Sequence, residues 1–334
     1  MRIHFWLPHY KIAGGTKVTL TYADLLARRG HDVRAYVPRP GLRERLFGRG
    51  TWRGRFRVPV HYVRSWNKAC ARECDAVVAD SWQVAKALAA CDTAAKKFEF
   101  IQHDERLYHG DPAAVERVYR TKELKKIVVA TWLKELFEQE FGETPALVMN
   151  TVNREEFHTI PGLRTPGKTR ILLLAHTYPW KGTREGVDIV TRLKHDHPEI
   201  RLIGFGVRAK KPPAGFDEYH HNPSPAELRA LYASADLFLC PSWDEGFGLP
   251  SVEAMACGAA LVTYDNGGSR EYAKDGETAF VAPRRDTEAL AEKLEAAVAD
   301  KPLRRRIAEA GTRFIERMPT WEEQAAKLES ILMA

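Results

Sequence analysis

The chain has 334 residues, of which 44% are apolar and 28% are charged. This length exceeds what one hydrophobic core usually supports, so we expect two domains of an ordinary globular protein. No apolar stretch reaches the ~20 residues that a membrane-spanning helix needs. Residues 1–8 are too few and too polar for the apolar core of a secretory signal. These features predict a cytoplasmic protein.

The net charge of +7 is unevenly distributed. Residues 1–150 contain 26 Lys and Arg against 17 Asp and Glu, a balance of +9, whereas residues 151–334 contain 25 against 27, a balance of −2. Much of the excess lies in residues 39–57, where one acid, Glu44, accompanies seven arginines: Arg39, Arg43, Arg45, Arg49, Arg53, Arg55 and Arg57.

Aromatic and leucine side chains are interleaved with these arginines, Trp52 among them. This mixture is typical of a segment that binds an anionic lipid surface. It could equally hold the phosphates of a nucleic acid, or be a solvated arginine-rich loop. On the first interpretation, Arg43, Arg49, Trp52 and Arg53 face the acceptor substrate or the membrane.

Residues 2–7 predict a buried strand, followed by a loop that ends in Gly14-Gly15, a helix over 16–29 and a strand over 32–37. This order is the opening of a doubly wound α/β domain. Further buried strands are predicted at 58–63, 76–79, 98–101, 127–130 and 146–149, with helices between several of them.

A polar stretch at 150–169 with two Pro-Gly pairs is the best candidate linker. A second α/β series follows, with strands predicted at 170–175, 201–204, 237–240 and 260–263, and helices at 184–193, 225–234, 250–257, 287–299, 303–317 and 321–332. We expect two Rossmann-like domains, residues 1–150 and 151–318, with residues 319–334 returning to the first.

The five cysteines, Cys70, Cys74, Cys91, Cys240 and Cys257, are an odd number and contain no Cys-x-x-Cys pair. Cys70 and Cys74 lie one helical turn apart, but no second ligand pair has a matching pattern. We predict five reduced, mostly buried thiols and no metal site.

Residues 244–258 carry the strongest motif of the chain, DEGFGLPSVEAMACG. A glycine-rich loop leads from a strand end to Pro250, and proline suits the first turn of a helix. Backbone N–H groups and a helix N-terminus at the carboxyl end of a parallel strand favour phosphate. Glu245 and Glu253 could accept hydrogen bonds from sugar or ribose hydroxyls, although each alone could be an ordinary loop or first-turn acid.

This motif resembles the donor-binding signature of glycosyltransferase family 4, a retaining family with the two-domain GT-B fold, whose mark is two glutamates separated by seven residues. Other positions agree in order: Gly14-Gly15 with the glycine loop, His103 with the active-site histidine, and Lys181-Gly182 with the phosphate-binding lysine. The turn at 265–271, with Glu271, agrees as well. The resemblance spans nearly the whole chain.

The resemblance implies a role for each matched residue. Glu245 and His103 are the expected catalytic residues, with Gly246 and Phe247 beside the transferred sugar. The donor phosphates are expected at Gly14, Gly15, His176, Lys181, Gly248 and Leu249. Ribose and base are expected at Glu253, Phe205 and His221.

Two features concern the charge of the donor diphosphate. The chain contains no Asp-x-Asp motif, so we expect no metal and no other cofactor; preset N–H groups and Lys181 can stabilise the developing charge instead. The family usually has an arginine where this chain has His176, and imidazole cannot make arginine's bidentate phosphate contact. Lys181 must then carry more of the charge.

The expected function is a retaining, metal-independent transfer of a hexose-type sugar from a nucleotide-diphosphate sugar to a glycan, glycolipid or lipid-linked acceptor, at the inner face of a membrane. This activity would serve cell-surface polysaccharide synthesis. Three alternatives stay open: a nucleotide-sugar-binding homologue without catalysis, an epimerase of the same fold, and a nucleic-acid binder. We expect no nucleic-acid partner, and the oligomeric state is not predictable.

Overall fold

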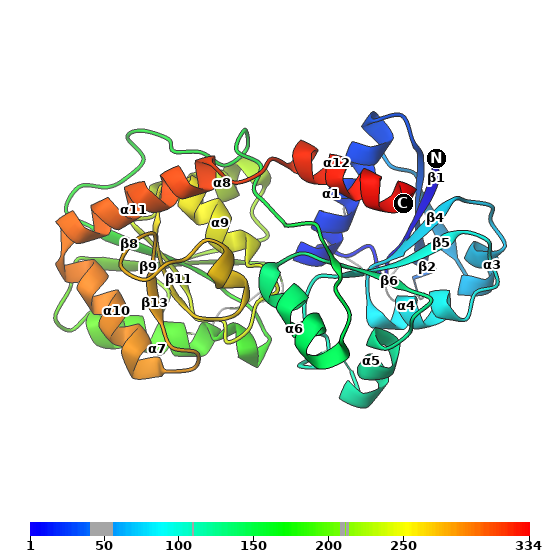
Figure 1. Cartoon of the computed structure of the whole chain (residues 1–334). Coiled ribbons are helices and arrows are strands. Elements are labelled where there is room, and N and C mark those ends of the chain that lie inside the picture. The colour runs from blue at the N-terminus through cyan, green and yellow to red at the C-terminus, as the bar shows by residue number, and fades with distance from the viewer. Residues whose placement is uncertain (41–55, 109, 208–210, 212–213) are drawn as a thin grey trace. The chain divides into compact units, whose positions relative to one another are not determined.

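The computed structural model describes residues 1–40, 56–108, 110–207, 211 and 214–334. The chain forms two compact units: unit 1 comprises Met1–Asn150 with Trp321–Ala334, and unit 2 comprises Thr151–Thr320. Each is a parallel α/β unit (Figure 1). The predicted residues Arg43, Arg49, Trp52 and Arg53 lie outside the described part of the chain.

The described residues of unit 1 form a seven-stranded parallel sheet in the order β3-β2-β1-β4-β5-β6-β7. Its strands are β1 (Arg2–Trp6), β2 (Asp32–Pro38), β3 (Val60–Val63), β4 (Ala76–Ala79), β5 (Lys96–Ile101), β6 (Lys125–Val128) and β7 (Ala146–Leu147). Its helices are α1 (Gly14–Arg28), α3 (Trp66–Cys70), α4 (Trp82–Ala89), α5 (Pro112–Tyr119), α6 (Thr131–Phe141) and α12 (Trp321–Met333).

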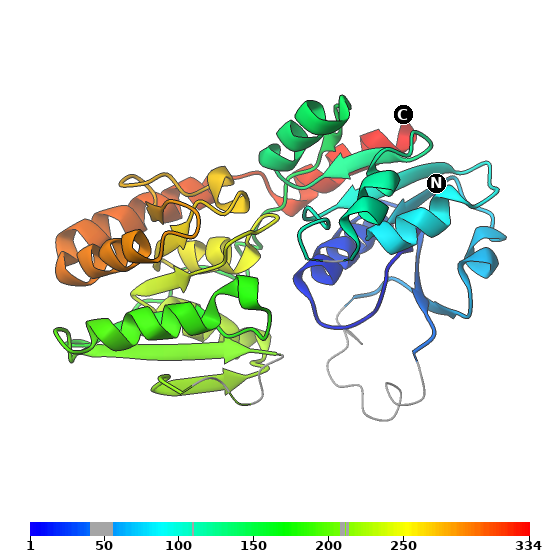
Figure 2. The same cartoon turned by 90° about the horizontal axis from the view of Figure 1, so that it is seen from below.

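The described residues of unit 2 form a six-stranded parallel sheet in the order β10-β9-β8-β11-β12-β13. Its strands are β8 (Thr169–Leu174), β9 (Ile200–Gly206), β10 (Glu218–His221), β11 (Leu237–Cys240), β12 (Ala260–Tyr264) and β13 (Phe280–Ala282). Its helices are α7 (Thr183–Leu193), α8 (Pro225–Ser234), α9 (Leu249–Ala256), α10 (Thr287–Ala299) and α11 (Lys301–Glu316), with 3₁₀ turns η1 (Pro179–Lys181) and η2 (Gly268–Glu271). Helices α10 and α11 lie side by side (Figure 2).

Strand order decides where each sheet can bind a ligand. In both sheets the direction of strand addition reverses next to the first strand, between β1 and β4 in unit 1 and between β8 and β11 in unit 2. Ligands of open α/β sheets bind outside the carboxyl ends of the strands at such a reversal. Gly14-Gly15 follows β1, and the segment from Pro241 to Gly248 follows β11.

The last helix, α12, packs on the first helix, α1. The Trp321 ring lies edge-on to Tyr22, with centroids 5.2 Å apart. Glu329 forms ion pairs with Arg29 and His31. These contacts place Trp321–Ala334 in unit 1 although the chain has passed through unit 2 (Figure 1).

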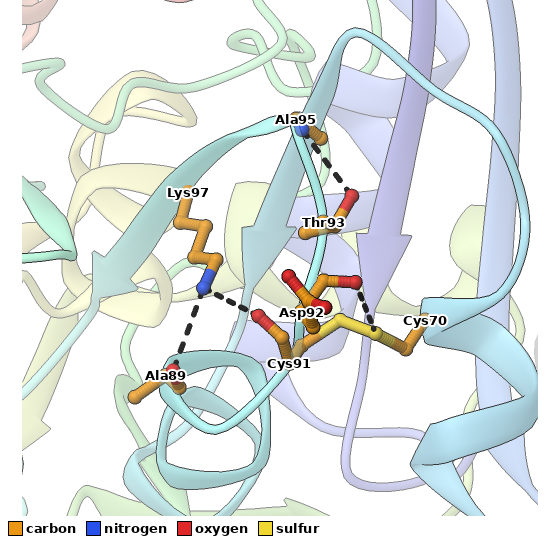
Figure 3. Close-up of a disulfide and its surroundings, with 7 residues drawn as sticks. All are labelled: Cys70, Ala89, Cys91, Asp92, Thr93, Ala95 and Lys97. Carbon is orange, nitrogen blue, oxygen red and sulfur yellow. Dashed lines mark hydrogen bonds between the residues drawn. A yellow bond between two sulfur atoms is a disulfide. The ribbon is translucent and has the colours of Figure 1, made fainter.

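The prediction of five reduced thiols is wrong for two of them, because Cys70 and Cys91 form a disulfide (Figure 3). Cys70 ends α3 and Cys91 follows α4, and the two helices are neighbours, which brings the Cα atoms to 5.8 Å. The positions of the cysteines along the chain do not show which two of them are close in space. Since disulfides persist mainly in oxidising compartments, this bond and the expected cytoplasmic location point in opposite directions.

Candidate active site

The candidate site of unit 2 is built at the carboxyl edge of its sheet, where β8 and β11 are neighbours. His176 and Lys181 follow β8, and Glu245 and Gly248 follow β11. Lys181, Glu245 and Gly248 line one small pocket there together with Cys240, Ser242 and Ser251. The structure therefore brings together the predicted phosphate lysine and the predicted catalytic glutamate.

Lys181 and Glu245 form an ion pair, with Nζ 2.5 Å from Oε1. Their side chains are 21% and 14% exposed, so the pair is accessible but shielded from bulk water. Gly182 makes this position available: its φ is +64°, and a Cβ there would lie 2.1 Å from the carbonyl oxygen of Pro241. Glycine thus lets η1 approach the end of β11 and places Lys181 beside Glu245.

The backbone of Glu245 is held by the turn after β12. Its N–H donates to the Asn266 carbonyl at 2.9 Å, and the N–H of Gly268 donates to the Glu245 carbonyl at 3.0 Å. The Tyr272 hydroxyl donates to the carbonyl of Phe247 at 2.9 Å. Gly246 and Phe247 are buried in this loop, so the loop around Glu245 is fixed by backbone hydrogen bonds.

Helix α9 begins directly after this loop. Gly248 has φ +90°, and a Cβ there would lie 2.3 Å from the Tyr272 hydroxyl. The N-cap residue, Gly248, has no side chain to cap the helix, which starts at Leu249 with Pro250 in its first turn. The N–H groups of a helix start carry partial positive charge and favour a phosphate group.

Glu253 lies one turn into α9 and is 5% exposed. The Tyr232 hydroxyl donates to its Oε2 at 3.1 Å, and burial, followed by the charge of Glu253, raises the pKa of Tyr232 well above its ordinary value. Phe205 is buried edge-on against Tyr232, with ring centroids 5.5 Å apart. His221 is exposed at the end of β10.

His176 follows β8 in a tight turn. Its Nδ1 accepts the N–H of Tyr178 at 3.1 Å, and its own N–H donates to Thr183 Oγ1 at 2.8 Å. Its ring lies 4.5 Å from that of Tyr178. The structure thus places His176 on the edge that carries Lys181, held by local backbone contacts.

In unit 1, Gly14 and Gly15 open α1, and Gln102 ties this helix start to the end of β5. The Gln102 amide donates to the Gly15 carbonyl at 3.0 Å and to Asp80 Oδ1 at 2.5 Å. His103 is the next residue, and its carbonyl accepts the Tyr119 hydroxyl at 3.4 Å. Gly14 and Gly15 therefore lie after β1 at the strand reversal of unit 1, and His103 follows β5, on the far side of β4.

Sequence reasoning missed two carboxylates beside these sites. Burial raises the pKa of Asp80 to about 7, against an ordinary value of 3.8. Asp80 directly follows the predicted strand 76–79, so its position at the carboxyl end of a strand could be predicted from the sequence. Glu185, in the first turn of α7, resembled a surface acid that favours a helix start.

Residues 159–314 match the family model described as glycosyl transferases group 1. A D-inositol 3-phosphate glycosyltransferase from Xylanimonas cellulosilytica is 33% identical over 159 residues, 43% of this chain and 38% of that protein. A phosphatidyl-myo-inositol mannosyltransferase from Mycobacterium leprae is 27% identical over 225 residues, 64% of this chain and 60% of that protein. The chain thus spans less than two thirds of each of these relatives.

Two solved structures cover nearly the whole fold. HepE from Anabaena in complex with UDP-glucose has a TM-score of 0.82 at 17% identity, covering 99% of this chain and 100% of that one. Sucrose-phosphate synthase from Thermosynechococcus elongatus has a TM-score of 0.81 at 15% identity, covering 99% and 98%. The predicted fold class, two Rossmann-like domains of the GT-B type, is confirmed. The group 1 region contains every unit 2 residue of the candidate site.

No group of three or more His, Cys, Asp or Glu side chains among the described residues is arranged to hold a metal ion. Of the helices in the described ranges, none is long and apolar enough to cross a membrane. Metal independence therefore remains a prediction, as does association with a membrane surface.

Proposed function

We propose that this protein is a retaining, metal-independent glycosyltransferase that moves a hexose-type sugar from a nucleotide-diphosphate sugar to a glycan, glycolipid or lipid-linked acceptor. The observation that carries the proposal is the Lys181–Glu245 ion pair at the strand reversal of unit 2, next to the start of α9, whose N-cap residue is a glycine. It lies within the region that matches the group 1 model.

In this proposal the donor diphosphate lies over the start of α9, where N–H groups and Lys181 neutralise it. Lys181 then exchanges part of its contact with Glu245 for phosphate oxygens. This exchange frees the Glu245 carboxylate to accept a hydrogen bond from the transferred sugar. The charge that develops on the leaving diphosphate meets donors that are already in place, so no metal is required.

The remaining residues keep their expected roles. Glu253 accepts hydrogen bonds from the ribose hydroxyls, and Phe205 and His221 lie towards the base. His176 contributes to binding the phosphates. Unit 2 binds the donor and unit 1 the acceptor, with His103 at the transferred sugar and Gly14-Gly15 at the phosphates. The departing phosphate takes the proton of the acceptor hydroxyl, and the anomeric configuration is retained.

The acceptor class rests on the arginine-rich stretch 39–57. Seven arginines with interleaved aromatic residues complement an anionic lipid surface. We propose that the protein works as a peripheral protein on an anionic membrane surface. Replacing Arg43, Arg49 and Arg53 by glutamine is expected to abolish cosedimentation with vesicles that contain anionic lipid; unchanged cosedimentation would contradict this part of the proposal.

The proposed activity is tested by incubating the protein with UDP-, GDP-, ADP- and dTDP-sugars in the presence of a chelator and following the products by mass spectrometry. HepE was solved with UDP-glucose, so a uridine donor is the first choice. We expect one donor to be cleaved, by transfer or by slow hydrolysis, and Glu245→Gln to lower the rate by about a hundredfold or more.

Two results would contradict the proposal. An isomerised donor with an intact diphosphate would point to an epimerase. Binding of a donor without cleavage, with every acceptor class supplied, would point to a homologue that has lost catalysis.

A further inference from the structure

Glu185 is a carboxylate on which four structural elements converge. It lies in the first turn of α7, four residues after Lys181. Its Oε2 accepts the Trp243 indole N–H at 3.0 Å, and its Oε1 accepts the Thr287 hydroxyl at 2.7 Å. The Tyr264 hydroxyl also donates to Oε1. Glu185 therefore joins α7 to the loop after β11, to the end of β12 and to the start of α10.

Two of these donors lead directly to Glu245. Trp243 is two residues before Glu245 in the same loop. Tyr264 is two residues before Asn266, whose carbonyl accepts the Glu245 N–H at 2.9 Å. The carboxylate of Glu185 thus holds one residue two positions before Glu245 and another two positions before Asn266, the hydrogen-bond partner of Glu245.

The same network also reaches Lys181. The backbone N–H of Trp243 donates to the Trp180 carbonyl at 2.8 Å, and Lys181 is the next residue. On its ring face, Trp243 is covered by the Arg285 guanidinium, 4.5 Å from the ring centroid. The indole is therefore fixed along its N–H edge and on one face, and its backbone N–H is bonded to the residue before Lys181.

The protonation of Tyr264 keeps this network intact. Tyr264 is fully buried, and burial, followed by its hydrogen bond to Glu185, raises its pKa above the ordinary value. The phenol therefore remains a donor at neutral pH. A buried donor that loses its acceptor destabilises its surroundings, so removing the Glu185 carboxylate should loosen the loop that carries Glu245.

We propose that Glu185 is a positioning residue of the donor site, which sets the Lys181–Glu245 pair at the separation that a donor sugar phosphate requires. The inference rests on the proposed function, because it assumes that the pair binds a nucleotide-diphosphate sugar. Glu185 touches neither donor nor acceptor; it acts through Trp243 and through the Tyr264–Asn266 segment.

Calorimetric titration of the nucleotide-sugar that the wild type cleaves, on three variants of the full chain, tests this role. Glu185→Ala is expected to weaken binding by about tenfold or more, the affinity change that one hydrogen bond to a charged group can make. Glu185→Gln keeps a carbonyl for the Trp243 N–H, and its amide can donate to the two hydroxyls, so binding should recover to within about threefold. Asp188→Ala, an exposed acid on the same helix, should bind like the wild type.

The outcomes separate the inference from the proposed function. Thermal unfolding of each variant reports folding, and Glu185→Gln keeps the test valid if Glu185→Ala does not fold. Wild-type affinity in a destabilised Glu185→Ala, or equal weakening in Glu185→Ala and Asp188→Ala, would overturn the positioning role while leaving the transferase proposal intact. A wild type that binds none of the nucleotide-sugars would refute the proposed function and, with it, this inference.

Discussion

Lys181 has two partners in this account, the Glu245 carboxylate and the donor phosphates. Replacing it by alanine should leave stability nearly unchanged, because partly exposed ion pairs contribute about 0–1 kcal/mol. Donor turnover should fall by about a hundredfold or more, since a charged donor to the leaving group is lost. Enzyme kinetics and thermal unfolding measure the two quantities.

Lys194→Ala is the matched control for this substitution. Lys194 forms an ion pair of 2.7 Å with Asp217, and the two side chains are 24% and 35% exposed. The control should keep full turnover. Equal loss of turnover in both variants would mean that Lys181 acts through general charge and not through the site.

Glu99 gives a pH dependence to the stability of unit 1. It is fully buried with Lys126, whose Nζ lies 3.4 Å from Oε2. Burial raises the pKa of Glu99 to about 7 from an ordinary 4.5, against the opposing charge of Lys126. Between these two values the folded state holds a proton that the unfolded state has lost, so the free energy of unfolding decreases as pH rises through this window.

We therefore expect urea denaturation to show falling stability from about pH 5 to pH 7.5, with Asp80, whose pKa is also raised to about 7, adding to the same slope. Glu99→Gln should flatten this slope, because the amide does not titrate. A slope as steep in Glu99→Gln as in the wild type would show that Glu99 is not its source.

Among the elements, α3 and the end of α4 are connected by the Cys70–Cys91 disulfide, with a sequence separation of 21. Because a bridge of this length lowers the entropy of the unfolded chain, it should stabilise the folded state by about 3 kcal/mol. Cys70→Ser should lower the free energy of unfolding by about that amount in oxidising buffer and have little effect under a reductant. Cys74→Ser, which removes a free thiol nearby, is the control.

Equal stability of wild type and Cys70→Ser in oxidising buffer would show that the bridge does not form in solution. The reactivity of Cys74 gives an independent check on this region. Burial raises the pKa of Cys74 to about 11, so its thiol should be alkylated slowly at neutral pH.

One buried contact of helix α12 with unit 1 is made by Trp321, which is 9% exposed and packs on Tyr22. Truncating a buried aromatic side chain costs about 3–5 kcal/mol, so Trp321→Ala should lower the free energy of unfolding by roughly this much. Glu322→Ala, at the exposed neighbouring position, should change it little. Chemical denaturation measures both, and similar values for the two variants would contradict the docking described here.

At the scale of the whole molecule, buried strands and the glycine–proline loop could be predicted from the sequence because both depend on local pattern. The strand β11, Leu237–Cys240, and the helix α8, Pro225–Ser234, have the expected bounds. Strands β10 and β13 were missed because β10 is polar in sequence and β13 has three residues only. Edge strands of this kind are defined by their neighbours in the sheet.

In the candidate site, too, local pattern could be predicted from the sequence and long-range contacts could not. The residue types of Lys181, Glu245 and Gly248 follow from the motif, but the 2.5 Å contact between the first two depends on how Gly182 packs against Pro241. The convergence of three donors on Glu185 and the Cys70–Cys91 bond are long-range contacts. A single sequence contains no signal for either.

The central claim is that unit 2 binds a nucleotide-diphosphate sugar over the start of α9. Calorimetric titration of UDP-, GDP-, ADP- and dTDP-sugars without metal, on wild type and Glu253→Gln, tests it most directly, because the glutamine keeps an acceptor for Tyr232 while removing the charge. We predict that one donor binds and that the substitution weakens it more than tenfold, about 1.4 kcal/mol. No binding by the wild type, or equal binding by Glu253→Gln, would contradict the claim.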